Sequence, residues 1–425
     1  MEENISIFDL LPTDEAEKYK PKKSTDWKWT MAKDYPTEKN GLKVFSCFAC
    51  GGGSTMGYKL AGCEVLGCCE IDQKMNEVYV KNHHPKYNFL MDIRDFNNLP
   101  NEKIPAELFD LDILDGSPPC TTFSMAGQRE ESWGKKKKFR EGQKEQTLDD
   151  LSFVFIDTVK KLKPKTVIME NVEGLLLGEA FEYVRNIYTK MRAAGYRMHH
   201  WLLKGENMGV PQTRHRVFFV AIRNDLNIDP MDLDMVFNYE PVTYGDIKSK
   251  VGDEFSEAAK KGKLYNLFLK ALPTEKNLCD VSVRLGGKNS YFQCYIVHDV
   301  DVLPTIRASR GYENYRYEDK TKTTIDDVIH AQTFPEDYDF GRRTINNVSY
   351  FCGMSVPPIM IKRIVTRLIE QGVYDYAKSV RSLQEKGHLP RHLFPKKGLY
   401  ASLEKEEQKT DYASEIKSKL TTKEG

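Results

Sequence analysis

One thiol in the sequence follows directly after two prolines. Cys120 ends the run Pro118-Pro119-Cys120, and the proline rings fix the backbone just before it. A thiol held at a set angle suits a nucleophile, whereas the commonest fate of a cysteine is to be buried and inert. Cys120 is therefore a candidate for covalent catalysis, with a structural role as the alternative.

Three ionisable side chains follow or precede other apolar runs. Glu170 opens Glu170-Asn171-Val172 after residues 167–169, and a carboxylate beside an apolar pocket has a raised pKa and donates a proton. The alternative is a plain loop carboxylate. Arg214 and Arg216 stand two residues apart in an extended segment, so both are expected on one face. They are candidates to bind a phosphate, or a carboxylate and a ligand carbonyl, with solvated surface arginines as the alternative.

Glycines cluster at residues 51–57, directly after another apolar run. They predict a strand-to-helix turn where a ligand approaches the backbone at a helix N-terminus. Glu70 lies about twenty residues further on, where a carboxylate binds ribose hydroxyls. The nicotinamide pattern G-x-G-x-x-G is not met, because Gly57 comes one place late. Asp92-Ile93 is either an adenine contact or an ordinary helix cap.

Short apolar runs that alternate with helical patterns must position these groups. The expected strands are residues 44–49, 65–69, 111–114, 167–169 and 217–222, and helical patterns cover 148–162 and 181–194. This alternation indicates an α/β fold with a doubly wound, Rossmann-like sheet. Ligands bind at the carboxyl edge of such sheets, and each candidate group stands at or near that edge.

The texture of the sequence divides the chain into five parts. Residues 1–40 form a polar, loosely held N-terminal arm, and residues 41–223 form the α/β domain. Residues 224–305 are a smaller irregular domain with a helical pattern at 255–272 and a β-like run at 290–297. Residues 306–375 include a helix at 356–370 with apolar residues at i, i+3, i+4 and i+7, and residues 376–425 are a charged tail.

Composition excludes several classes of protein. No run approaches the roughly 20 apolar residues of a membrane helix, and the acidic N-terminus lacks a secretory signal. The nine cysteines are an odd, scattered set, which is typical of free thiols in a cytoplasmic protein. Cys47 and Cys50 have CxxC spacing without a second pair, so no metal is expected. The net charge of +1 gives no global basic field.

The order of these motifs resembles that of the cytosine-5 DNA methyltransferases, which use S-adenosylmethionine. Residues 332–338 are similar to the ninth motif of that family and residues 353–358 to its tenth. The likeness covers residues 41–371, with 224–300 unmatched. It implies a methyltransferase sheet and a target-recognition domain at 224–305.

The resemblance also implies roles for individual residues. Cys120 would attack C6 of cytosine, Glu170 would bind the N3 and amino edge, and Arg216 would contact O2 with support from Arg214. Glu70 would bind ribose hydroxyls and Asp92 the adenine amino group. The other implied cofactor residues are Phe48, Gly51, Gly53, Ile71, Ile93, Pro119 and Ser355.

Several positions depart from the family pattern or add to it. Cys50 replaces a glycine, Met354 an asparagine, and Asp326 and His330 stand where arginine is usual. Residues 129–145 hold seven basic and four acidic side chains, a net charge of +3 that favours phosphate contact. Candidate base-reading residues in and just after the recognition segment are Arg284, Lys288, Asn289, Arg307 and Arg310.

The expected substrate is double-stranded DNA, from which the target cytosine must be flipped out. The family analogy favours a monomer in the cytoplasm of a bacterial or phage-infected cell, with or without a cognate restriction endonuclease encoded separately. A tRNA cytosine-5 methyltransferase is the nearest alternative. An inactive DNA-binding paralogue would be expected to lack Cys120 or Glu170, and an NAD-dependent oxidoreductase would not need either motif.

Overall fold

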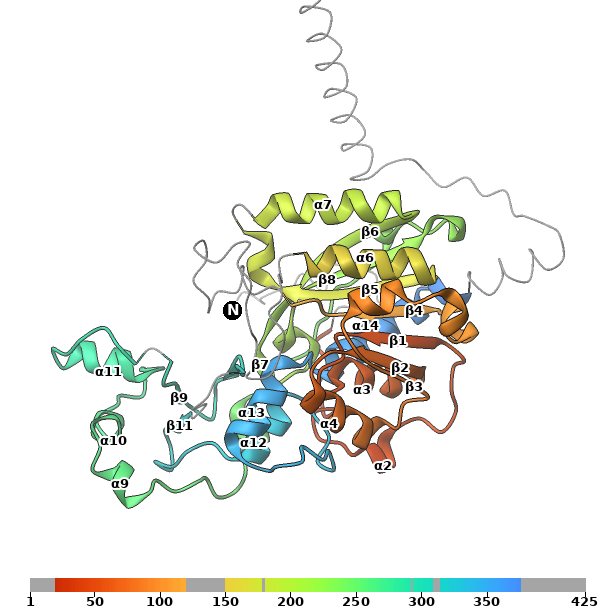
Figure 1. Ribbon diagram of the computed structural model, residues 1–425. Helices are drawn as coiled ribbons and strands as arrows, with labels where there is room; N and C mark the ends of the chain where they lie inside the picture. Colours follow the sequence, from red (N-terminus) through yellow and green to blue (C-terminus); the bar gives the residue numbers. More distant parts are fainter. Residues whose placement is uncertain (1–19, 120–149, 178–179, 292, 309–313, 376–425) are drawn as a thin grey trace, which may run out of the picture.

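The centre of the computed structural model is a seven-stranded sheet with helices on both faces (Figure 1). The structure describes residues 20–119, 150–177, 180–291, 293–308 and 314–375. The strand order is β3-β2-β1-β4-β5-β8-β6. The bounds are β1 Lys43–Cys47, β2 Glu64–Glu70, β3 Tyr87–Leu90, β4 Ile113–Gly116, β5 Thr166–Val172, β6 Tyr196–Lys204 and β8 His215–Arg223.

The sheet is parallel from β3 to β5, and β8 runs antiparallel to both β5 and β6. Its central strands are covered on both faces, so they read as continuous apolar runs. The run 217–222 of β8 is buried throughout. The predicted doubly wound α/β fold is confirmed, and the expected strands lie within a few residues of the observed ones.

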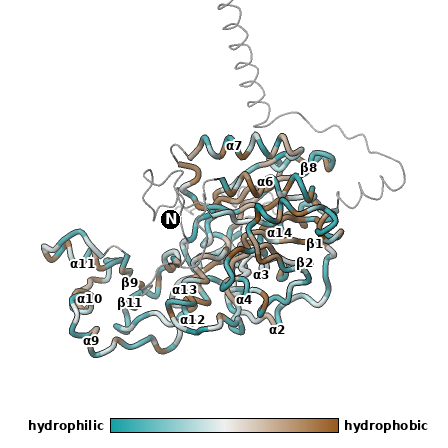
Figure 2. Tube along the Cα trace, in the orientation of Figure 1, coloured by the Kyte–Doolittle hydropathy of each residue, from teal (hydrophilic) through white to brown (hydrophobic). Residues whose placement is uncertain are grey.

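Two apolar cores flank the sheet, and Figure 2 shows the hydrophobic residues gathered there. One face is covered by α3 (Gly53–Leu60), α4 (Gln73–His83) and α14 (Pro358–Glu370), and the other by α5 (Ile93–Asn98), α6 (Leu151–Leu162) and α7 (Ala180–Ala193). The helices α3 and α14 pack closely. A Cβ added at Gly57 would lie 2.4 Å from the Pro358 carbonyl oxygen, so only glycine allows this approach.

The described part of the N-terminal arm, residues 20–40, packs against the body of the protein. The side chain of Trp29 is only 6% exposed and belongs to the core on the α14 face. A short helix, α2 (Met31–Asp34), follows it. The expectation of a loosely held arm is wrong for these residues, because two tryptophans in a polar segment supply enough apolar surface to anchor it. Residues 1–19 and the tail 376–425 lie outside the described residues.

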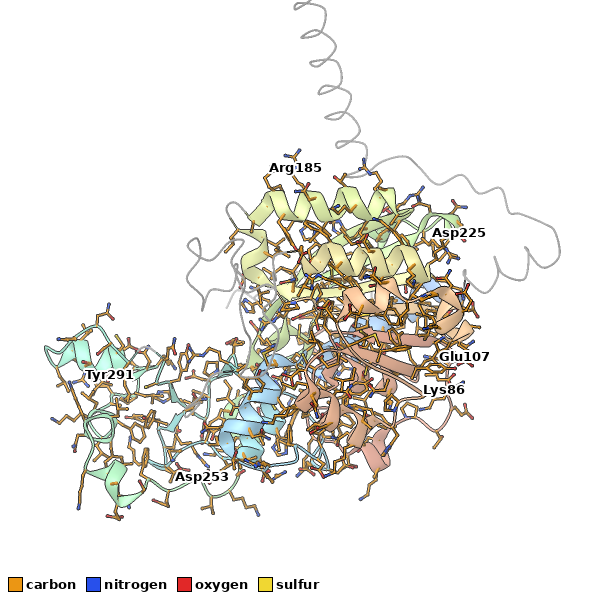
Figure 3. The ribbon with its side chains drawn as sticks, in the orientation of Figure 1. Lys86, Glu107, Arg185, Asp225, Asp253 and Tyr291 are labelled. Carbon is orange, nitrogen blue, oxygen red and sulfur yellow. The ribbon has the colours of Figure 1, made fainter. Side chains whose placement is uncertain are left out.

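A smaller outlying unit, residues 255–317, lies to one side of the sheet and includes the labelled Tyr291 (Figure 3). Its core contains seven buried apolar residues of the described chain. The elements are α9 (Glu257–Lys260), α10 (Lys263–Phe268), α11 (Leu278–Arg284), β9 (Ile296–Val297) and β11 (Tyr315–Arg316).

Two expectations for this unit need correction. The single helix at 255–272 is two short helices, because the first ends before Gly262, which has the extended backbone of an N-cap. Among the described residues of the β-like run at 290–297, only the last two form a strand, β9. Among the helices of the described chain, none has the length and apolar character needed to cross a membrane.

Candidate active site

The carboxyl ends of β1, β2, β4 and β5 meet at one edge of the sheet, and most of the candidate residues follow them. Ser117 Oγ donates a hydrogen bond of 3.3 Å to the Phe48 carbonyl, which joins the segment after β4 to the turn after β1. Asn171 Nδ2 donates a hydrogen bond of 3.2 Å to the Pro118 carbonyl, which joins the same segment to β5. The chain that leads into Cys120 is therefore tied on both sides, while Cys120 itself lies outside the described residues.

The turn between β1 and α3 is unusually tight. Phe48, Cys50 and Gly52 all have left-handed backbone angles, with φ of 56°, 47° and 82°. A side chain in this region costs about 1–2 kcal/mol, so Cys50 occupies a position that favours glycine. Cys50 replaces a glycine of the family pattern, and the turn accommodates the cysteine side chain in this left-handed conformation.

Gly51 and Gly53 are required by packing against the C-terminal part of the chain. A Cβ at Gly51 would lie 2.9 Å from the Phe351 ring, and one at Gly53 would lie 2.2 Å from the Val356 carbonyl oxygen. The Tyr338 hydroxyl also donates a hydrogen bond to the Gly51 carbonyl. The glycine turn is therefore held from behind by residues about 300 positions later in the chain.

Glu70 ends β2 with its carboxylate buried against this turn. Its two oxygens accept hydrogen bonds of 2.8 Å each from the backbone N–H groups of Cys50 and Asp72. Burial raises the pKa of Glu70 above its usual value, and the two N–H groups oppose that shift. The Ile71 N–H also interacts with this carboxylate, which has about four lone-pair positions and can therefore accept a further donor such as a sugar hydroxyl.

Asp92 is the N-cap of α5, where it accepts a hydrogen bond of 2.8 Å from the Arg94 N–H. The Arg94 guanidinium also lies 3.4 Å from the Asp92 carboxylate and pairs with Asp150. Asp92 therefore acts as a helix cap in this structure, which was one of the two roles expected for it. Ile93 is buried, at 4% exposure.

Ser355 is a buried residue at the end of α13 (Ile345–Met354). Its side chain is 3% exposed, and its Oγ has no hydrogen-bond partner within the part of the chain that the structure describes. A buried hydroxyl left unpaired costs free energy unless a ligand satisfies it. Met354, which precedes it, is partly buried against the core on the α14 face.

Glu170 and Arg216 form a close ion pair. Arg216 Nε lies 2.9 Å from Glu170 Oε1, and both side chains are at most 15% exposed. The pairing follows from strand register: Glu170 faces Phe218 across the β5–β8 ladder, so Arg216 is its diagonal neighbour on the same face. Burial lowers the pKa of Arg216, and the Glu170 carboxylate opposes this shift.

Arg214 does not share that face, contrary to the expectation that both arginines serve one ligand. It donates hydrogen bonds of 3.0–3.1 Å to the carbonyls of Ile306, Gly353 and Ser355. The cause is a break between β7 (Gln212–Thr213) and β8, because side-chain alternation does not carry across the break. The Arg214 guanidinium therefore ties its own segment to two distant ones, at residue 306 and at residues 353–355.

The comparisons with known proteins agree with this arrangement. A model of the C-5 cytosine-specific DNA methylase family matches residues 42–370. The chain belongs to this family. Type II methyltransferase M.NgoPII from Neisseria gonorrhoeae is 29% identical over 77% of this chain and 95% of its own length. Type II methyltransferase M.Eco47II from Escherichia coli is 32% identical over 76% of this chain and 80% of its own length.

A solved structure of a DNMT2 variant from Spodoptera frugiperda has the same fold, with a TM-score of 0.54 at 16% identity. It covers 77% of this chain and 100% of the other. The resemblance carried by the ordered motifs is thus confirmed. This methyltransferase acts on cytosine C5 in DNA in a sequence-specific manner, and its family uses S-adenosylmethionine as the methyl donor.

The methyltransferase also has a buried acid, Asp115, that no sequence motif singled out. Asp115 of β4 is 3% exposed and accepts hydrogen bonds from Ser46 Oγ at 2.5 Å and Tyr58 OH at 3.0 Å. Burial raises its pKa to about 7, while these donors oppose the shift and nearby Glu170 adds to it. The available signal was an aspartate between Leu114 and Gly116 in an otherwise apolar strand.

Other expected contacts are placed in part. Arg284 is occupied by an ion pair to Glu275 at 2.7 Å, and Arg307 lies over the Tyr295 ring at 5.5 Å. Asn289 Oδ1 accepts a hydrogen bond from the Cys279 thiol at 2.8 Å. Residues 129–145 and Arg310 lie outside the described residues.

His330 and Asp326, the two residues that stand where arginine is usual in the ninth motif, each contact other parts of the chain. His330 contacts the Ile247 carbonyl through Nδ1 at 3.2 Å and Glu336 through Nε2 at 3.1 Å. Asp326 pairs with Arg343. Their neighbour Asp327 accepts hydrogen bonds of 2.7 Å from the Tyr244 hydroxyl and the Ser249 N–H, which also holds this part of the chain against residues 244–249.

Proposed function

We propose that this methyltransferase acts on a cytosine flipped out of double-stranded DNA and that it works through a covalent bond to Cys120. The observation that carries the proposal is the buried pair of Glu170 and Arg216 beside Asn171, whose amide binds the Pro118 carbonyl at 3.2 Å. A carboxylate and a guanidinium thus stand next to the segment that leads into the thiol. A thiolate, a proton donor and a cation are the groups that activation of cytosine requires.

The chemistry follows from the electron demand of the ring. The Cys120 thiolate adds to C6, and a new S–C6 bond makes C5 nucleophilic. In its protonated form Glu170 would donate a hydrogen bond at N3 and accept one from the amino group, while Arg216 would stabilise the negative charge at O2. Bound S-adenosylmethionine would supply to C5 a methyl group carried on a sulfonium, whose sulfur leaves neutral. A base such as water then takes the C5 proton, the C5–C6 double bond re-forms, and the S–C6 bond breaks to restore the Cys120 thiolate.

The residues at the sheet edge fit this methyl donor. The Glu70 carboxylate can accept a further hydrogen bond from a ribose hydroxyl, and Ser355 Oγ is a buried hydroxyl that a ligand would satisfy. Asp92 would bind the adenine amino group while it caps α5. The remaining residues assigned to this site are Phe48, Gly51, Gly53, Ile71, Ile93 and Pro119.

The partners follow from the same proposal. The outlying unit would contact DNA and read the target sequence. The protein would act as a monomer in the cytoplasm, since base flipping by this architecture needs no second copy. The Type II relatives favour a cognate restriction endonuclease encoded separately.

The test is cytosine-methylation sequencing of DNA from a methylation-free host that expresses the chain, beside a Cys120→Ala variant. Methylation at one short sequence with the wild type, and none with Cys120→Ala, is the expected result. Methylation that persists in Cys120→Ala would overturn the covalent mechanism. Unmarked DNA from folded wild-type protein would favour the tRNA alternative, which RNA substrates would then test.

A further inference from the structure

A segment outside the matched family model braces the cofactor side of the methyltransferase. The N-terminal strap, residues 22–37, precedes residue 42, where the match to the family model begins. Its contacts include three remote parts of the chain. Lys22 exchanges backbone hydrogen bonds with Asn238 and Glu240, and Asp26 pairs with Lys362 and Arg363 of α14 at 2.9 Å.

The third contact is with residues 332–338, and it is the most extensive. Trp29 Nε1 donates a buried hydrogen bond of 2.8 Å to the Thr333 carbonyl, and the Trp29 carbonyl accepts one from the Glu336 N–H at 2.9 Å. The Asp337 carboxylate accepts hydrogen bonds from the Met31 and Ala32 N–H groups at 2.8 and 3.1 Å. The strap therefore binds this segment near its start, at Thr333, and near its end, at Glu336 and Asp337.

The gripped segment contains a strained residue. Thr333 has a left-handed backbone with φ of 57°, which a β-branched side chain rarely adopts. Such a conformation persists only where the surroundings enforce it. Here the Thr333 carbonyl is held by Trp29, and Thr333 Oγ1 accepts a hydrogen bond of 3.3 Å from the Ile359 N–H at the start of α14.

The opposite side of the same segment reaches the cofactor residues. Gln332 Nε2 donates a hydrogen bond of 2.8 Å to the Ser355 carbonyl. The Tyr338 hydroxyl donates one to the Gly51 carbonyl in the glycine turn. Residues 332–338 thus link the strap on one side to Ser355 and Gly51 on the other.

We propose that the strap, through the bond from Trp29 to Thr333, holds residues 332–338 in the strained form that positions Ser355 and Gly51 for the cofactor. The inference rests on the proposed cofactor site. It makes Trp29 a positioning residue that acts on cofactor affinity and not on methyl transfer. The strap makes no described contact with Glu170 or Arg216.

The test is titration calorimetry of S-adenosylhomocysteine with the full chain. Trp29→Phe removes the hydrogen bond and keeps the ring, and it should weaken binding roughly fivefold. Methylation at saturating S-adenosylmethionine should stay within about twofold of wild type. Asp26→Asn is the matched control, because it loosens the strap at α14 without touching Thr333, and it should leave affinity within about twofold.

A second substitution separates positioning from simple destabilisation. Thr333→Gly relieves the left-handed strain, so Trp29→Phe/Thr333→Gly should regain most of the lost affinity. Unchanged binding in Trp29→Phe, an equal loss in Asp26→Asn, or no recovery in the double variant would each overturn the role of the strap. Ser355→Ala tests the cofactor site itself: if it binds like wild type, the proposed site is wrong, whatever Trp29→Phe does.

Discussion

The sheet edge and the outlying unit hold their functional side chains in different ways. At the edge, the ion pair of Glu170 and Arg216 is buried in a seven-stranded sheet, and the glycine turn is held by residues from the far end of the chain. In the described part of the outlying unit, seven buried apolar residues support two-residue strands and helices of four to seven residues. Chemistry needs fixed geometry, whereas a lightly supported unit can vary its surface without disturbing the sheet.

The largest expected effect comes from a substitution in the core of the outlying unit, which should impair that unit and leave the sheet edge intact. Phe268 is fully buried in the outlying unit, and truncation of such a ring costs about 3–5 kcal/mol. Phe268→Ala should abolish DNA binding while the affinity for S-adenosylhomocysteine stays at the wild-type value, as measured by DNA gel shift and calorimetry. Val283→Ala, at a site that is 52% exposed, is the control. Parallel loss of both activities would mean that the two regions fold as one.

The next effect isolates the chemistry at the sheet edge. Glu170→Gln removes the carboxylate that pairs with Arg216, and we expect the methylation rate to fall at least roughly a hundredfold. Binding of S-adenosylhomocysteine should not change. Glu173→Gln, at the exposed start of the next turn, should keep nearly full activity. A Glu170→Gln enzyme with near wild-type turnover would remove Glu170 from the mechanism.

A third prediction concerns the buried Asp115, whose pKa is raised to about 7. Between its unfolded value near 3.8 and pH 7 the folded state binds more protons, so stability falls as pH rises through this window. Between pH 6 and pH 8 the loss attributable to Asp115 is about 1 kcal/mol. In urea unfolding at the two pH values, Asp115→Asn should therefore show a smaller drop than wild type. An equal drop in both proteins would contradict this prediction.

The smallest effect tests whether strain in the glycine turn is local. Cys50→Gly relieves a left-handed backbone, and we expect the free energy of unfolding to rise by about 0.5–1 kcal/mol. Ala49→Gly is the matched control and should lower it by about the same amount, because its backbone is not left-handed. Chemical denaturation of both variants measures the difference. Destabilisation by Cys50→Gly would show that the thiol packs better than its backbone angle suggests.

The sequence predicted the central strands of the sheet because burial on both faces leaves continuous apolar runs, as in 217–222 of β8. It did not predict β6, whose edge position allows His199 and His200 within the strand. Glu170 and Arg216 were separate candidates in the sequence, and their contact depends on the register of β5 and β8. The separation of Arg214 depends on a strand break that no local pattern marks. The strap was missed for a similar reason, since its partners lie about 300 residues away.

The packing of α3 against α14 also determines when, during synthesis of the chain, the glycine turn can be completed. Gly57 and Ile361 are neighbours in the folded protein, yet about 300 residues separate them along the chain. At 5–20 residues per second, the ribosome adds Ile361 roughly 15–60 s after Gly57. Until then the glycine turn lacks the backbone that closes it from behind. A nascent chain therefore cannot complete the proposed cofactor site until the residues around Ile361 have been synthesised and have left the ribosome.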